Sequence, residues 1–142
     1  MTYATQDDLV ARYGDYMVRE LTDRADPPAG AIDPAVVAHA LDDADAVIDG
    51  YLKGRYALPL AETPRLVRDL AQAIAIYKLH RDTVSDKIRR EYEDAIATLK
   101  QIGTGVVRLD VAGVEPASSG SSGVQFSDRP RDMTPDNMKG FI

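Results

Sequence analysis

The sequence predicts an all-α fold, a small helical bundle of three main helices preceded by two short ones. In three separate stretches the apolar residues recur every three or four positions, which is the spacing of a helix with one buried face. Each stretch also begins with residues that favour the first turn of a helix. At 142 residues the chain has the length of a single domain, and it contains no cysteine that could form a disulfide or a thiolate metal site.

Two short helices are expected before the bundle. Thr5 and Asp8 form a variant of the capping box, in which each side chain accepts a hydrogen bond from the other residue's backbone N–H. Gly14 suits the end of this first helix, and a second short helix is expected from Asp15 to Leu21.

The three main helices are each predicted by a start signal followed by apolar residues at helical spacing. The start signal is a residue whose side-chain oxygen can cap the first turn, with proline after it in two of the three cases. The expected helices are 34–53 after Asp33, 64–81 after Thr63 and 85–102 from Ser85. The middle helix is apolar nearly all round between Leu70 and Ile76, so it should be the most buried of the three.

After the third main helix the helical pattern is expected to stop. Val106 to Val114 is rich in β-branched residues and alternates weakly, which predicts a short β element. Ala117 to Gly123 reads ASSGSSG, the composition of a flexible linker. We therefore divide the chain into a helical domain, residues 1–115, and a flexible linker with a C-terminal arm, residues 116–142.

The charges are unevenly distributed along the chain. Residues 1–61 contain 11 acidic and 5 basic residues, whereas residues 62–102 contain 7 acidic and 8 basic residues. This asymmetry favours head-to-tail contact between copies over contact with phosphate, so direct sequence-specific binding to nucleic acid is not expected. No apolar stretch approaches the length of a membrane span, so no membrane association is expected.

The first main helix carries a row of acids on one side, at Asp42, Asp45 and Asp49. Carboxylate oxygens in such a row could face a divalent metal ion. The spacing is not that of a calcium loop, however, and the sequence offers no second cluster of the kind that two-metal sites draw from other elements. We therefore interpret the row as a surface that faces solvent or a partner, with no bound metal and no cofactor.

The histidines offer little support for catalysis. His39, with Asp43 four residues later, could form a hydrogen-bonded dyad, and Ser85 is a conceivable nucleophile. No nucleophile elbow, phosphate-binding loop or dinucleotide fingerprint accompanies them. Helix capping and surface positions explain all three residues, so we do not expect an enzyme.

Two further stretches are candidates for contact with partners. The run RYALPL after the first main helix is apolar and contains proline, so it should be extended and either fold back over the bundle or meet a partner. The arm has scattered apolar residues that suit anchors on another subunit better than a core of their own. The candidate interface residues are Asp42, Asp45, Asp49, Arg55, Tyr56, Leu58, Pro59, Phe126, Met133, Met138, Phe141 and Ile142.

With these elements placed, the sequence resembles a family of small virion proteins of Mu-like phages and prophages. The run IDGYL at 48–52, continued by Arg55-Tyr56 and Leu58-Pro59-Leu60, carries most of the resemblance. The other matching residues are Tyr3-Ala4-Thr5, Asp8-Leu9, Leu21-Thr22-Asp23, Asp33 through Ala40-Leu41, Asp43-Ala44, Pro64, Leu66, Ala75, Tyr77, Leu79, Tyr92, Ala95, Leu99, Arg129 and Gly140-Phe141.

The resemblance implies a structural role. Members look like head–tail connectors, the adaptor or head-completion proteins of tailed phages, which are mostly helical and assemble as a ring beneath the portal. This implies a homo-oligomer in the assembled state, portal and tail-completion proteins as partners, and a location in the virion, or in the host cytoplasm during assembly. The residues alone leave an alternative, a small acidic helical binding module, regulatory or chaperone-like, for a basic protein partner.

Overall fold

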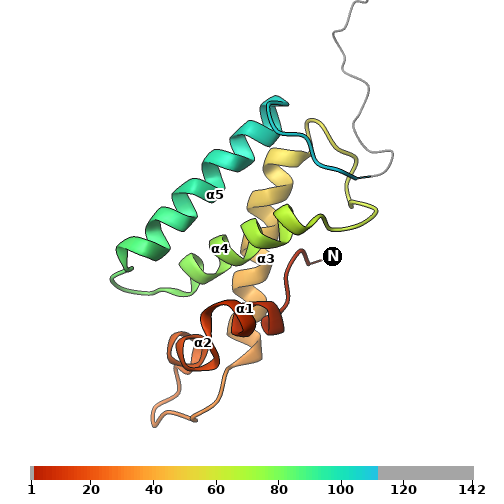
Figure 1. Ribbon diagram of the computed structural model, residues 1–142. Coiled ribbons are helices and arrows are strands. Elements are labelled where there is room, and N and C mark those ends of the chain that lie inside the picture. The colour runs from red at the N-terminus through yellow and green to blue at the C-terminus, as the bar shows by residue number, and fades with distance from the viewer. Residues whose placement is uncertain (1, 112–142) are drawn as a thin grey trace, which may run out of the picture.

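The computed structural model describes residues 2–111, and all regular secondary structure within them is α-helical. The five helices (Figure 1) are α1 Gln6–Tyr13, α2 Asp15–Thr22, α3 Pro34–Leu52, α4 Arg65–Leu79 and α5 Asp86–Thr104. The predicted all-α class and the order of two short and three long helices are confirmed, and the ends of each long helix lie close to the expected residues.

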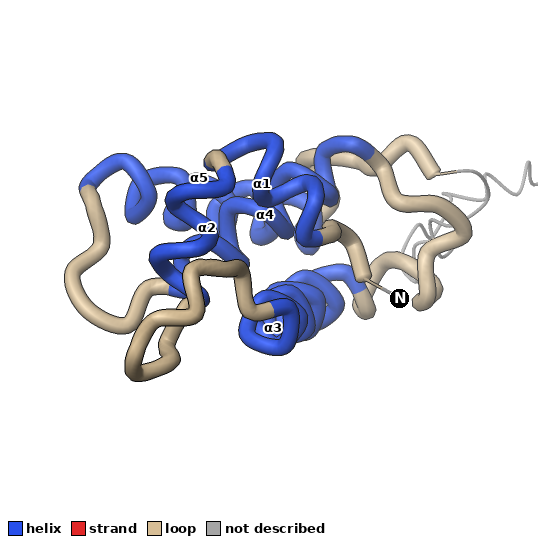
Figure 2. Tube along the Cα trace, turned by 90° about the horizontal axis from the view of Figure 1, so that it is seen from below, coloured by secondary structure: helices blue, strands red, loops and turns tan. Residues whose placement is uncertain are grey.

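The helices form two layers. Figure 2, which looks along α3, shows α3 on one side and the other four helices on the other. α4 crosses α3, and α5 packs against both of them. α3 turns a continuous set of apolar side chains toward the other layer: Val37, Ala40, Leu41, Ala44, Ile48 and Leu52.

α4 is the most buried helix, as its composition predicts. Every residue from Leu70 to Ile76 is buried, including the polar Gln72. The helix is enclosed because α3 packs on one side of it and α1, α2 and α5 pack on others. No helix within residues 2–111 is both long and apolar enough to cross a membrane.

The start signals are confirmed for three helices and wrong for one. The Asp33 carboxylate accepts a hydrogen bond from Ala35 N–H at 2.9 Å, and Ser85 Oγ accepts one from Ile88 N–H at 3.4 Å. The capping box of α1 is present in both directions. Thr63 does not cap α4, however, because Pro64 occupies the N-cap position and makes no side-chain capping bond.

The expected β element at 106–114 is wrong for the part that is described, since residues 106–111 form no strand. α5 ends at Gly105, whose φ of 83° is a left-handed conformation that favours glycine. The Val106 and Val107 N–H groups then both donate to Gln101 O, at 2.9 and 3.2 Å. These amides therefore complete the end of α5 and are not available to a β ladder.

The remaining predictions for the C-terminal part fall on residues that the structure does not describe. These are the end of the β element at 112–114, the linker 117–123, the arm 124–142 and the domain boundary between 115 and 116.

Candidate interaction surface

The acid row on α3 is largely covered by the start of the chain. Asp45 is only 8% exposed, and its Oδ1 accepts a hydrogen bond from Tyr3 N–H at 3.0 Å. The Tyr3 hydroxyl donates a short hydrogen bond to Asp49, which is half-buried. The expectation that the whole row faces solvent or a partner is therefore wrong for Asp45, and of the three carboxylates only that of Asp42 belongs to an exposed residue.

This contact has an electrostatic cost. Burial raises the pKa of the Asp45 carboxyl, and the nearby charges of Asp49 and Asp42 raise it further, while the hydrogen bond from Tyr3 N–H opposes them. Burial and the bond to Asp49 likewise raise the pKa of the Tyr3 hydroxyl. Ionised Asp45 is thus less favourable here than in water. The hydrogen bond from Tyr3 N–H, in the segment before α1, holds the Asp45 carboxylate in place.

The described residues present no constellation for metal or nucleophilic chemistry. Within residues 2–111 no group of three or more His, Asp or Glu side chains is arranged to hold a metal ion. His39 Nδ1 does lie 3.4 Å from Asp43 Oδ2, but both side chains are on the surface. Ser85 Oγ is occupied as the cap of α5.

The RYALPL run folds back over the bundle, one of the two outcomes expected for it. Tyr56 and Leu60 are 3% and 2% exposed, and the Tyr56 hydroxyl accepts a hydrogen bond from Leu109 N–H at 3.0 Å. Leu58 is half-buried, whereas Pro59 is exposed. Burial thus takes Tyr56 off the surface that a partner could reach, and contact through the other interface residues of this run stays a prediction.

Arg55 fixes this run to the end of α5. A Cβ atom built on Gly105 would lie 2.6 Å from the Arg55 guanidinium carbon, so the guanidinium packs directly on the glycine backbone. Gly105 therefore serves two purposes at once, since it adopts a left-handed conformation and leaves room for this side chain.

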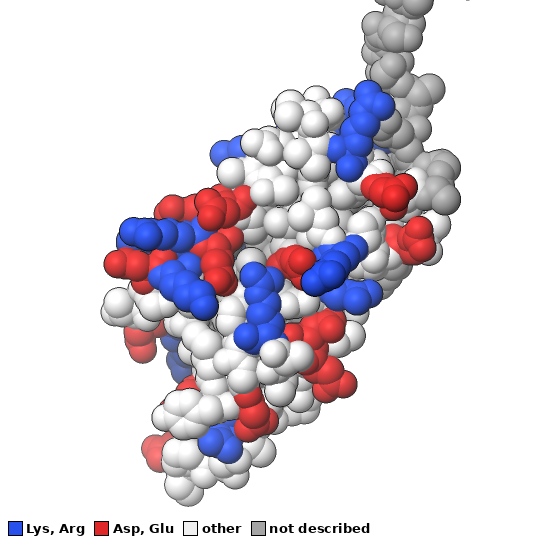
Figure 3. Space-filling model, in the orientation of Figure 1, with Lys and Arg blue, Asp and Glu red and all other residues white. Residues whose placement is uncertain are grey.

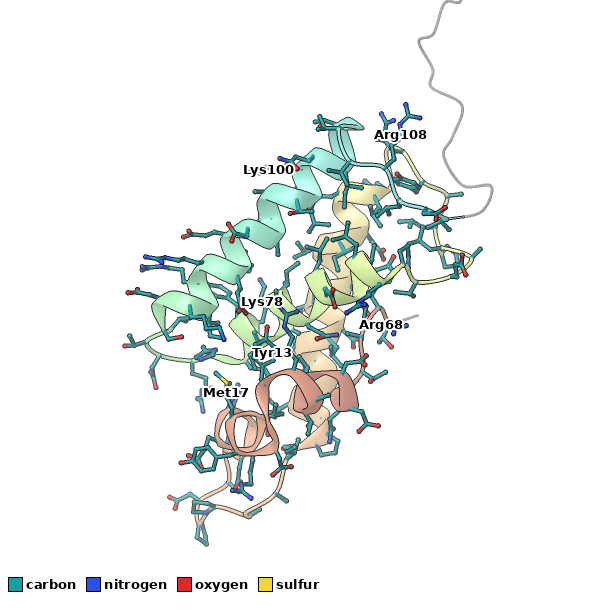
Figure 4. All side chains as sticks on the ribbon, in the orientation of Figure 1. Tyr13, Met17, Arg68, Lys78, Lys100 and Arg108 are labelled. Carbon is teal, nitrogen blue, oxygen red and sulfur yellow. The ribbon has the colours of Figure 1, made fainter. Side chains whose placement is uncertain are left out.

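A groove runs between α3 and α5 on the side away from the acid row. We call it the α3–α5 groove. It has a volume of about 480 Å³ and is lined by Ala46, Val47, Gly50, Tyr51, Tyr92 and Ile96. An adjoining hollow of about 300 Å³ shares Tyr92 and Ile96 and continues along α5 to Lys100. Figure 4 shows Lys100 on the C-terminal half of α5.

The side chains at the groove are held in place by the bundle. The Tyr92 ring stacks on Tyr77 of α4, with ring centres 3.9 Å apart and ring planes 9° from parallel. Val47, Tyr51, Tyr92 and Ile96 are all half-buried, so apolar surface is left open to solvent. Ala46 and Gly50 are too small to fill the space between the two helices.

Two further hollows on the described surface include several charged side chains in their lining. One contains Arg24, His39, Asp43 and Lys78. Another contains Arg12, Asp69, Glu91 and Asp94, and there Tyr13 reaches across from α1 to donate to Glu91 at 3.1 Å (Figure 4). Figure 3 likewise shows both signs of charge crowded over the N-terminal half of α5. Unlike these two hollows, the α3–α5 groove has no charged residue in its lining.

Sequence reasoning missed the groove because its apolar residues lie on the same helical stripes as the core. The available signal is local: Val47 and Tyr51 lie at the edge of the α3 stripe, beside the small residues Ala46 and Gly50. The candidate residues Phe126, Met133, Met138, Phe141 and Ile142 lie outside the described part of the chain.

Comparison with known proteins identifies the family. The model of the family "Bacteriophage Mu, Gp36" matches residues 3–127. The chain is similar to the Mu-like prophage FluMu protein gp36 of Haemophilus influenzae, with 31% identity over 140 residues that cover 99% of this chain and 98% of the relative. It is also similar to gene product J of Escherichia phage Mu, with 36% identity over 143 residues that cover the whole of both chains. The predicted resemblance is thus confirmed, and the chain belongs to the bacteriophage Mu Gp36 family.

Proposed function

We propose that this chain is a structural protein of a Mu-like phage or prophage, a head–tail connector that assembles as a ring beneath the portal. The observation that carries the proposal is the extent of the family match, which includes residues 3–127 and, in gene product J of phage Mu, a relative that aligns with this chain over the whole of both. The match thus covers the bundle and continues well beyond it. In the proposed role the chain acts by contact with copies of itself, with the portal and with tail-completion proteins, in the virion and in the host cytoplasm during assembly.

The surface of the bundle supports a role in assembly. A ring of identical copies needs two different patches that fit one another, because each copy contacts one neighbour on each side. The α3–α5 groove supplies one apolar patch. Exposed apolar side chains also occur away from it, with Tyr16 69% exposed on α2 and Val106 75% exposed after α5.

The alternative of a small acidic module for a basic partner has less support. That reading needs the carboxylates of α3 to form one accessible surface. Tyr3 covers Asp45 and engages Asp49, so two of the three carboxylates are already occupied within the chain.

Sedimentation velocity tests the proposal. The full-length chain is mixed with the purified portal protein of the same prophage, and we expect it to sediment with the portal as a high oligomer. A variant lacking residues 124–142 should keep nearly the same melting temperature, because the described core lies within residues 2–111, and should lose association. The connector role would be contradicted if the full-length chain does not bind the portal and instead binds one basic client protein at a 1:1 ratio.

A further inference from the structure

We propose that the α3–α5 groove binds the apolar C-terminal segment, residues 124–142, of a neighbouring copy of this chain. The inference deepens the proposed function and rests on it, because it supplies a contact between copies that a ring requires.

The lining of the groove favours binding of an apolar group. Val47 and Tyr51 on one wall and Tyr92 and Ile96 on the other are half-buried and line a space of about 480 Å³. Covering them removes apolar surface from water, which stabilises a complex by roughly 25 cal/mol for each Å² buried. If apolar side chains covered the two hollows that contain charged residues, those charged groups would lose contact with water without gaining hydrogen bonds.

The C-terminal segment has matching chemistry. It contains five large apolar residues, Phe126, Met133, Met138, Phe141 and Ile142. Methionine and phenylalanine suit an irregular groove, because the methionine side chain adapts its shape and the aromatic ring buries a large area. The segment has three acidic and three basic residues, and the rim formed by α5 also carries both signs, at Glu93 and Lys100. Neither side therefore repels the other through net charge.

The geometry of the chain allows the segment to reach another copy. The described chain ends at Val111, which is buried, and Leu109 is fixed to Tyr56 of the loop after α3. The 12 residues from 112 to 123 can span up to about 40 Å when extended. A domain of this size is roughly 35 Å across, since its radius of gyration is about 13 Å. The segment can thus cross from its own bundle to the groove of an adjacent one.

Disulfide trapping tests the contact directly, because the natural chain has no cysteine. One full-length variant carries Ala97→Cys, at an exposed position beside the groove, and a second carries Met138→Cys in the segment. The second variant has an N-terminal tag so that mixed dimers differ in mass from identical pairs. In the matched control, an Ala11→Cys variant takes the place of the Ala97→Cys variant. Ala11 is exposed on α1 and is far from the groove residues in the sequence. Each mixture is oxidised mildly in two samples. One sample contains the two variants alone at high concentration, and the other also contains the portal protein.

We expect the Ala97→Cys and Met138→Cys mixture to give a mixed dimer at least fivefold more abundant than the Ala11→Cys control does, in whichever sample sedimentation shows oligomers. Equal trapping in the control overturns the inference, and so does an absence of trapping in a sample that is oligomeric. A chain carrying both Ala97→Cys and Met138→Cys that closes only on itself, at all concentrations, also overturns it, because the groove then holds its own segment.

The outcomes separate this inference from the proposed function. Portal binding without the mixed dimer leaves the connector role standing and removes the groove contact. The mixed dimer without portal binding supports the groove contact and removes the connector role. A chain that stays monomeric in both samples contradicts both.

Discussion

The buried stripe of α3 has an acidic edge and an apolar edge. These two edges differ in their accessibility to solvent, and the difference is the reverse of what the polarity of their side chains suggests. One edge carries Asp45 and Asp49, and the Tyr3 segment covers it through two hydrogen bonds. The other edge carries Val47 and Tyr51 and borders an open groove. The acidic edge is therefore closed within the chain, whereas the apolar edge is accessible. Whether a neighbouring segment of the chain covers an edge, and not its polarity alone, thus decides which part of a helix is free to meet a partner.

The difference has a physical cause on each side. At the acidic edge, Tyr3 supplies both an N–H group and a hydroxyl, so burial of Asp45 is accompanied by a hydrogen bond. At the apolar edge, Tyr92 is held face to face with Tyr77 of α4, and the space between it and Tyr51 stays unfilled. Each edge can be altered separately from the stripe between them.

The largest effect on stability is expected at the buried centre, away from both edges. Ile74→Ala on α4 and Leu41→Ala on α3 should each lower the free energy of unfolding by about 2–5 kcal/mol, because both side chains are packed and their removal leaves a cavity. Urea denaturation measures the change. An unaltered denaturation midpoint in either variant would show that the residue is not part of the core.

A smaller loss is expected at the closed edge. Tyr3→Phe keeps the ring but removes the hydrogen bond to Asp49, and bonds to charged groups contribute about 1.5–3 kcal/mol. The variant should therefore unfold at a lower urea concentration than the wild-type chain. Tyr16→Phe, which changes an exposed tyrosine, is the matched control and should have no measurable effect. Equal effects of the two variants would mean that Tyr3 does not hold this edge closed.

A pH-dependent effect is expected from Asp45. Because burial raises the pKa of Asp45 in the folded chain, the unfolded chain loses this proton first as the pH rises. The contribution of Asp45 to stability is thus complete below the ordinary aspartate pKa and falls as the pH rises through the raised pKa. Asparagine can still accept the Tyr3 N–H bond without ionising.

Asp45→Asn should therefore gain stability relative to the wild-type chain as the pH rises above about 4, the ordinary aspartate pKa. Urea melts at half-unit pH intervals measure the difference. Asp82→Asn removes one charge from an exposed position in the loop between α4 and α5 and controls for the change in net charge. If the stability of Asp45→Asn relative to the wild-type chain falls as the pH rises, the pH dependence has the opposite sign to the one expected. That result would contradict the burial of an ionised Asp45.

The smallest effect on stability is expected at the open edge. Ile96→Gln changes a half-buried side chain that lines the α3–α5 groove, so the free energy of unfolding should fall by less than about 1 kcal/mol. Association between copies should nevertheless be lost, because a polar group then enters the apolar contact. Urea melts and sedimentation velocity on the same sample separate the two quantities. Normal association of this variant would indicate that the groove is not an interface.

Local signals predicted most of the fold. The cap at Asp33, the cap at Ser85 and the apolar period of the three long helices each act within one or two turns, so the sequence displays them directly. The strand expected from Val106 onward is wrong because β propensity is weak, and here the Gln101 carbonyl of α5 accepts the Val106 and Val107 N–H groups.

The candidate surface was harder to predict because its contacts span the chain. Tyr3 and Asp45 are 42 positions apart, and no local pattern links them. The same holds for the groove, whose two walls come from α3 and α5. A periodic stripe shows which residues avoid water on one helix, but it does not show where two stripes fail to meet.

The most direct test of the open apolar edge is its protection on assembly. Ala97→Cys and Ala11→Cys are labelled with a maleimide, first as dilute free protein and then in the oligomer formed with the portal. We expect both cysteines to react at similar rates in the free chain, and Ala97→Cys alone to react at least tenfold more slowly in the oligomer. Equal labelling of both cysteines in the oligomer would contradict the claim that copies meet at the α3–α5 groove.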